Sequence, residues 1–151
     1  MRFNPYEADS TAYGHLFELA RHLAKGALDP EVRALVEIRA SQINGCAFCL
    51  AMHADGARKH GVEQTKLDLL AGWRESDDFT IEERAALALV EEMVRIGDGG
   101  RVEAATWDAA RSAFSDEELS ALMFSVTLIQ SWNMLNVTVE MPPGIELPRP
   151  R

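Results

Sequence analysis

The stretch NGCAFCLAMHADGARKHG, residues 44–61, decides how the rest of the chain is interpreted. It contains both cysteines of the protein, Cys46 and Cys49, and a histidine, His53. In a helix, residues three or four positions apart lie on the same face, so we expect these three side chains on one side of one helix. Two thiols and an imidazole placed in this way indicate a redox site.

The dipeptide Asn44-Gly45 is predicted to end the preceding helix, which places the cysteine pair in the first turn of the next one. There, unpaired backbone N–H groups and the positive end of the helix dipole stabilise a thiolate, and so does a neighbouring imidazolium. A thiolate can attack a peroxide O–O bond to give a sulfenic acid, and a second cysteine within reach can condense with it to a disulfide. A dithiol reductant must then reopen that disulfide.

Two other interpretations of the pair are open. Free cysteines are often small buried hydrophobic residues, but a second cysteine three positions away and a histidine one turn further on favour redox chemistry. Zinc could instead be bound by Cys46, Cys49 and His53, with His60 as the fourth ligand. Because His60 lies nearly two turns beyond His53, and structural zinc sites usually draw four ligands from two separate segments, we rank zinc behind redox chemistry.

Two further residues complete the candidate site. His53 follows Cys49 by one helical turn and is the candidate acid/base partner, although a histidine on a mostly apolar helix is often only a core residue. Glu37, in the helix that leads into the site, is the candidate base. The alternative interpretation of Glu37 is a solvated surface carboxylate beside a neighbouring arginine.

Composition limits the class of protein. The chain has 151 residues, enough for one domain with a real core, and a net charge of −9 from 15 Lys+Arg against 24 Asp+Glu. This charge argues against nucleic acid and anionic membrane surfaces as partners. The N-terminal sequence MRFNPYEADS lacks the apolar region of a signal peptide, so we expect a cytosolic protein. In that reducing compartment a close cysteine pair favours catalysis or metal binding over a structural disulfide.

Gly and Pro divide the chain into segments with helical patterns, which predicts an all-α bundle of about seven helices in a single domain over residues 1–151. Residues 119–139 carry no charge and could match a membrane span in length, but their scattered polar residues favour a buried helix or an oligomer interface. The prolines of residues 142–151 predict an extended tail. The expected helices cover about residues 10–25, 30–44, 46–61, 63–71, 80–96, 102–114 and 115–139.

The segment RASQINGCAFCLAMH, residues 39–53, resembles the signature of the alkylhydroperoxidase D-like, or carboxymuconolactone decarboxylase, family. The segments AGWRES (71–76), FTIEERAALALVE (79–91) and SWNMLNV (131–137) are also similar to that family. The resemblance therefore covers nearly the whole chain, and its most specific part surrounds the two cysteines.

The resemblance implies an all-helical subunit that assembles into a homotrimer or homohexamer and has peroxidase activity. It assigns peroxide attack to Cys49, resolution to Cys46, and proton transfer to His53 and an upstream glutamate. It implies hydrogen peroxide or organic hydroperoxides as substrates and a dithiol protein or lipoyl group as reductant. No metal, flavin or haem cofactor is expected.

This sequence departs from the family pattern at two positions. The family glutamate usually stands at the position of Ala34. Glu37 lies one helical turn later on a similar face, so two alternatives are open: Glu37 takes the same role, or the relay is altered. Met134 stands where many similar sequences carry arginine. Two rival functions stay open: a decarboxylase-like lyase, which would need a cationic anchor that no convergent Arg/His set provides, and a non-enzymatic oligomeric redox sensor.

Overall fold

The structure of the protein is a computed structural model that describes residues 1–147. Within this range it contains eight α-helices, two 3-10 helices and no strand, which confirms the all-α prediction. Part of the predicted extended tail, residues 148–151, lies outside the described residues. The elements are α1 (Pro5–Ala8), α2 (Ser10–Leu23), α3 (Pro30–Asn44), α4 (Ala47–Lys59), α5 (Gln64–Leu69), η1 (Leu70–Glu75), α6 (Ile81–Val94), η2 (Ile96–Asp98), α7 (Ala104–Ala113) and α8 (Asp116–Thr138).

Local capping explains where most of these helices begin. Asp29 caps α3 by accepting hydrogen bonds from two backbone N–H groups, and Thr80 and Ser115 form the two expected capping boxes of α6 and α8. The first helix differs from the prediction because α2 is capped by Asp9 and ends at Leu23. The four-residue α1 was not predicted, since it is too short to show a helical period.

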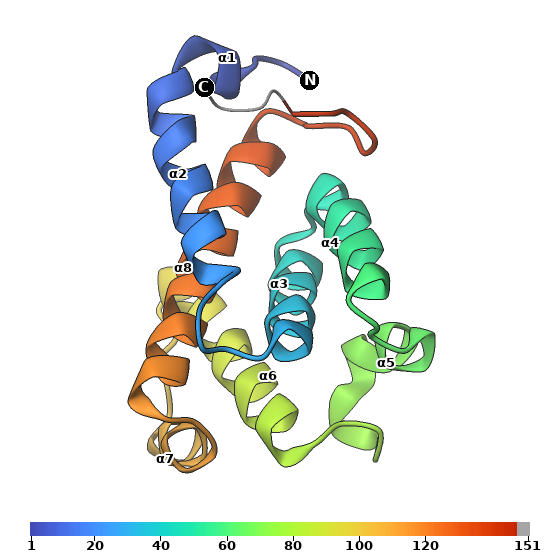
Figure 1. Ribbon diagram of the computed structural model, residues 1–151, viewed down its shortest axis with the longest axis vertical. Helices are drawn as coiled ribbons and strands as arrows, with labels where there is room; N and C mark the ends of the chain where they lie inside the picture. The colour runs from blue at the N-terminus through green and yellow to red at the C-terminus, as the bar shows by residue number, and fades with distance from the viewer. Residues whose placement is uncertain (148–151) are drawn as a thin grey trace.

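Helix α3 lies in the middle of the molecule, where it packs against α4, α6 and α8 (Figure 1). Helices α2 and α8 run side by side, and α7 packs on α6 and α8. The apolar middle of α6 is buried, as expected from its sequence. This arrangement places the start of α4, and so the cysteine pair, close to both α3 and α8.

A buried ion cluster ties α3 to the 3-10 segment η1. Glu91 accepts hydrogen bonds from Arg39 Nε at 2.7 Å, from Trp73 Nε1 at 2.9 Å and from Arg74 Nη1 at 2.5 Å. Burial raises the pKa of the Glu91 carboxyl, but these three hydrogen bonds outweigh burial and leave its pKa below the ordinary value. The cluster therefore holds a charged carboxylate inside the fold.

The uncharged helix α8 is buried on only one side within the single chain. Leu122, Val126 and Ile129 point into the core, whereas Phe124 and Met134 are 55% and 70% exposed. Of the two expectations for this helix, the chain's own core covers one face only, and the exposed face is available to a neighbouring subunit. Across residues 1–147, no helix combines the length and apolarity needed to cross a membrane.

Candidate redox site

The turn between α3 and α4 delivers the cysteines to the start of a helix. Gly45 ends α3 with a φ of 67°, a left-handed conformation that favours glycine. The backbone N–H of Cys46 bonds back to the carbonyl of Ser41 at 3.0 Å, which fixes the direction of the chain as it leaves the helix. The prediction that Asn44-Gly45 breaks the helix is confirmed.

Cys46 and Cys49 are joined in a disulfide at the first turn of α4. Cys46 is the N-cap residue of α4, and its sulfur accepts a hydrogen bond from the backbone N–H of Cys49 at 3.2 Å. Both residues are buried, at 2% and 1% exposure. The sulfur atoms thus lie among the unpaired N–H groups of a helix N-terminus, where negative charge is stabilised.

Glu37 and His53 meet across two helices. Glu37 Oε2 on α3 lies 2.9 Å from His53 Nδ1 on α4, and the other carboxylate oxygen lies 3.9 Å from Arg33 Nε. His53 Nε2 is buried and has no hydrogen-bond partner within residues 1–147. The imidazole is therefore held by Glu37 at one nitrogen, and its other nitrogen has no partner among the described residues.

Two residues that the sequence analysis did not assign to the site also reach the disulfide region. Asn136 Nδ2 on α8 donates a hydrogen bond to Cys49 Sγ at 3.4 Å, and Asn136 Oδ1 accepts one from the hydroxyl of Tyr6. Asn136 belongs to the segment SWNMLNV, which contributes to the family resemblance. It also lies in an uncharged, largely apolar helix, where a side-chain amide indicates a buried polar contact. No local pattern links α8 to Tyr6, 130 positions earlier.

A pocket of about 510 Å³ lies beside these residues. Its polar lining consists of Glu37, His53, Asn136 and Glu146, and no Lys or Arg among the described residues lines it. Neither cysteine lines it, so Asn136 is the lining residue that contacts Cys49 sulfur directly. The remaining walls are Tyr13, Phe17, Ala20, Phe48, Met52, Leu128, Ile129, Trp132, Ile145 and Leu147.

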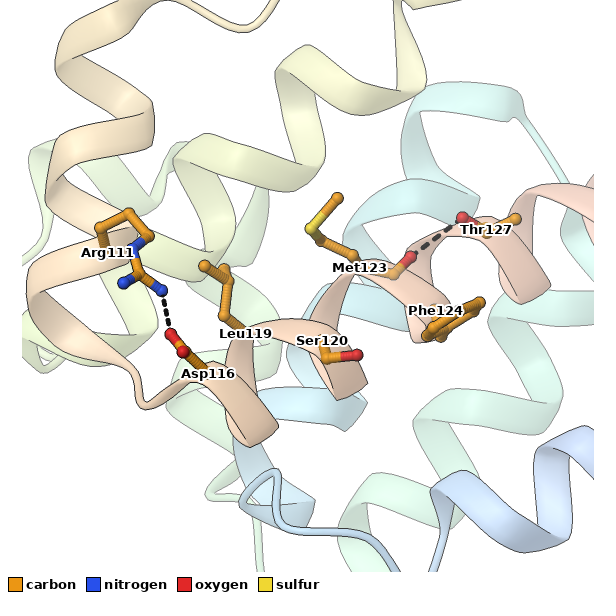
Figure 2. A pocket seen from close by; sticks show the side chains of 7 residues that line it. All are labelled: Arg111, Asp116, Leu119, Ser120, Met123, Phe124 and Thr127. Carbon is orange, nitrogen blue, oxygen red and sulfur yellow. Dashed lines mark hydrogen bonds and ion pairs between the residues drawn. The ribbon is translucent and has the colours of Figure 1, made fainter.

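A second pocket, of about 500 Å³, lies between α7 and the first half of α8 (Figure 2). Figure 2 shows Met123 and Phe124 beside this hollow, with an ion pair between Arg111 and Asp116 at one end. It contains neither a cysteine nor a histidine. Among residues 1–147, no group of three or more His, Cys, Asp and Glu side chains is arranged to hold a metal ion. The chemistry-bearing side chains are therefore concentrated beside the first pocket.

Comparison with known proteins gives the family. The model described as "Carboxymuconolactone decarboxylase family" matches residues 11–92. The uncharacterized protein YdfG of Bacillus subtilis (strain 168) is 30% identical over 138 residues, which are 91% of this chain and 93% of YdfG. The chain belongs to the carboxymuconolactone decarboxylase family.

Solved structures agree with this assignment. ATU0492 from Agrobacterium tumefaciens, a protein of unknown function with a suggested assignment as the antioxidant defence protein AhpD, is 31% identical. Its structure superposes with a TM-score of 0.88 over 96% of this chain and 99% of its own. The debrominase Bmp8 has a TM-score of 0.73 at 20% identity, covering 87% of this chain and 69% of its own, and shares the fold alone. The alkylhydroperoxidase D-like fold is thus confirmed.

Proposed function

We propose that this protein is a thiol-dependent peroxidase of the alkylhydroperoxidase type, which reduces hydrogen peroxide or organic hydroperoxides through Cys46 and Cys49. One observation carries the proposal: a disulfide at a helix start lies next to a pocket that is also lined by a Glu37–His53 pair, whose buried imidazole nitrogen Nε2 has no partner within residues 1–147. These are the groups that a thiol peroxidase needs, namely a nucleophile, a resolving thiol and a proton carrier.

In the proposed cycle the reduced enzyme begins with a Cys49 thiolate, whose proton has passed to His53. The thiolate sulfur attacks the distal peroxide oxygen, an S–O bond forms, the O–O bond breaks, and the departing alkoxide takes the proton from His53. The products are an alcohol and the sulfenic acid of Cys49. The Cys46 thiol then attacks that sulfur, and water leaves as the disulfide forms. An external dithiol reduces the disulfide and becomes a disulfide itself.

The disulfide form described above corresponds to the end of this cycle, before the reductant acts. Its sulfur atoms are covered, so the peroxide is proposed to reach Cys49 from the pocket, past Asn136. The reductant is proposed to be a dithiol protein or a lipoyl group. The cycle needs no metal, flavin or haem. Because it consumes a reduced dithiol, we place the protein in the cytosol.

A lyase that acts on a small carboxylic acid is the rival enzyme function. Such an enzyme needs a cation to bind the substrate carboxylate, as Arg does in bidentate pairs. The pocket instead presents two carboxylates, Glu37 and Glu146, and no Lys or Arg of the described chain lines it. These charges favour a neutral substrate and therefore the peroxidase over the decarboxylase.

We also propose that the protein is a homo-oligomer, a trimer or a hexamer. Support comes from the exposed face of α8, where Phe124 and Met134 lie on a helix without charged residues beyond its first turn. Exposed apolar side chains that gather on one face often mark subunit contacts. Met134 stands where many similar sequences carry arginine, and it does not line the redox pocket. This difference therefore concerns the exposed face of α8.

The decisive experiment measures peroxide consumption with dithiothreitol as donor for wild type, Cys46→Ser and Cys49→Ser. We expect repeated turnover through the intramolecular disulfide only in wild type. After reduction and removal of the donor, Cys46→Ser should consume about one peroxide per chain and accumulate a sulfenic acid, whereas Cys49→Ser should consume none. Oxidation of wild-type thiols without repeated turnover would support the redox sensor instead. Lyase activity on a lactone that survives Cys49→Ser would support the decarboxylase.

A further inference from the structure

A chain of two hydrogen bonds connects the N-terminal helix to one of the two sulfur atoms. The Tyr6 hydroxyl in α1 donates to Asn136 Oδ1 at 2.5 Å, and Asn136 Nδ2 donates to Cys49 Sγ at 3.4 Å. Tyr6 and Asn136 are both buried, at 2% and 3% exposure. Neither contact caps a helix, because α1 and α8 are capped by other residues.

We propose that Asn136 is a positioning residue of the redox site, held in one amide orientation by Tyr6, and that its N–H group stabilises the attacking thiolate of Cys49. The role of Cys49 as the sulfur that attacks peroxide rests on the proposed function. In the structure the sulfur of Cys49 is part of the disulfide. Its position represents that of the Cys49 thiolate sulfur in the reduced form of the proposed enzyme. A buried N–H donor beside a thiolate acts as it does beside any anion, by favouring the charged form.

The two sulfur atoms have different donors, which distinguishes their roles. The sulfur of Cys46 accepts the backbone N–H of Cys49, as the cap of α4. The sulfur of Cys49 accepts the side-chain amide of Asn136. The amide comes from a residue that also lines the pocket, so the added donor lies between the pocket and the sulfur of Cys49. This is the arrangement expected if Cys49 attacks and Cys46 resolves.

Tyr6 determines which end of the amide faces the sulfur. A side-chain amide can be turned by 180°, and only one orientation presents N–H to Cys49. A phenol that donates its proton to the amide oxygen selects that orientation. Burial, together with the nearby Tyr13, raises the pKa of Tyr6 to about 12, against a smaller opposing effect of its hydrogen bond to Asn136. The phenol is therefore protonated at every pH at which the enzyme would work.

Aromatic packing keeps the Tyr6 ring in place. Its centroid lies 4.9 Å from that of Tyr13 on α2 and 5.8 Å from that of Trp132 on α8. Replacement by Phe should leave this packing and remove only the hydroxyl. The other titratable groups around the pocket are Tyr13, Glu37, His53 and Glu146, and a test must separate Asn136 from them.

The test measures the pKa of the Cys49 thiol in the Cys46→Ser background, where Cys49 is the sole remaining cysteine. The rate of alkylation by iodoacetamide between pH 4 and 10 reports thiolate formation. Because a hydrogen bond to a charged group is lost, Asn136→Leu should raise this pKa by about one to two units. Tyr6→Phe should raise it by less, in the same direction. The other titrating groups are unchanged in all variants.

Asn133→Leu is the matched control. Asn133 lies on the same helix one turn earlier and is equally buried, but it bonds to Ser41 and Asn44 and not to a sulfur. We expect it to lower the melting temperature without moving the thiol pKa. The proposal is overturned if Asn136→Leu and Tyr6→Phe leave the thiol pKa within about 0.3 units of the parent, roughly a third of the smallest shift expected for Asn136→Leu. It is also overturned if Asn133→Leu shifts the pKa as much. Tyr6→Phe alone decides the question if Asn136→Leu does not fold.

Alkylation needs no peroxide, so this experiment is independent of the peroxidase assay. A raised thiol pKa in a protein that never consumes peroxide would overturn the proposed function and support the role of Asn136 toward the thiolate. Peroxidase activity in a protein whose thiol pKa does not change in the variants would support the proposed function and overturn the role of Asn136. In an active enzyme, kcat/KM at pH values below the thiol pKa should fall about 10- to 100-fold in Asn136→Leu and recover at high pH.

Discussion

Replacement of Glu37 by Gln tests whether this carboxylate serves the proton relay. The substitution keeps the size of the side chain and one hydrogen-bond acceptor for His53 Nδ1, but it removes the negative charge 2.9 Å away. In the proposed cycle His53 holds the proton between the thiol and the leaving alkoxide, and at that stage the Glu37 carboxylate faces the positive charge of the imidazole. The substitution should therefore slow peroxide attack.

The size of the effect follows from the geometry. Two unit charges 2.9 Å apart interact by about 1.4 kcal/mol in a water-like dielectric and by about 6 kcal/mol at an effective dielectric constant of 20. The side chains of His53 and Glu37 are 17% and 21% exposed, which places the pair between these limits. A loss of about 1.5–3 kcal/mol, typical of a hydrogen bond to a charged group, corresponds to a roughly 10- to 100-fold decrease in kcat/KM.

The assay is the initial rate of cumene hydroperoxide reduction with excess dithiothreitol, from pH 5 to 9. Arg33→Gln is the control, because it removes the other charge near Glu37 and leaves the bond to His53 intact. We expect Arg33→Gln to stay within about threefold of wild type, as exposed or partly exposed ion pairs contribute little. A folded Glu37→Gln variant with wild-type kcat/KM would refute the relay, as would an equal loss in both variants.

Three further predictions concern stability, substrate charge and assembly. The pKa of the Glu91 carboxyl is lowered in the fold, so its stabilising contribution is complete above the ordinary pKa of a glutamate and is lost as pH falls from there through the lowered pKa of the folded state. Glu91→Gln should cost about 3–5 kcal/mol at pH 7 and flatten the acid limb of stability in urea denaturation. The carboxylates of Glu37 and Glu146 should repel a negatively charged substrate. At low salt, kcat/KM should therefore be at least about threefold higher for methyl linoleate hydroperoxide than for the free acid, and a preference for the acid would contradict the pocket charges. Sedimentation velocity should give an oligomer for wild type and a smaller species for Phe124→Glu, and a wild-type monomer at all concentrations would count against the α8 interface.

The sequence predicted the parts of the fold that depend on neighbours along the chain. The capping boxes at Thr80 and Ser115 and the break at Gly45 are local patterns, and each appears where expected. The exposure of Phe124 was not predicted, because an uncharged helix has no polar stripe to indicate which side faces outward.

The site was predictable only along one helix. The spacing of Cys46 and Cys49 fixes their proximity, and the disulfide agrees with it. The 2.9 Å contact between Glu37 and His53 depends on how α3 and α4 rotate against each other, which periodicity does not determine. Asn136 depends on the packing of α8 on the start of α4, and no sequence signal specifies that register.

The short span of the disulfide has a consequence for the stability of the fold. Cys46 and Cys49 are three positions apart, so the bond closes a ring of only a few residues. By the chain-entropy relation a ring of about four residues restricts the unfolded chain by only about 2 kcal/mol, against about 4.7 for a hundred-residue ring. The scaffold is held by α3, α6 and α8 instead. The repeated opening of this disulfide that the proposed cycle requires should therefore cost the fold little stability, because helix packing and not the disulfide holds the chain together.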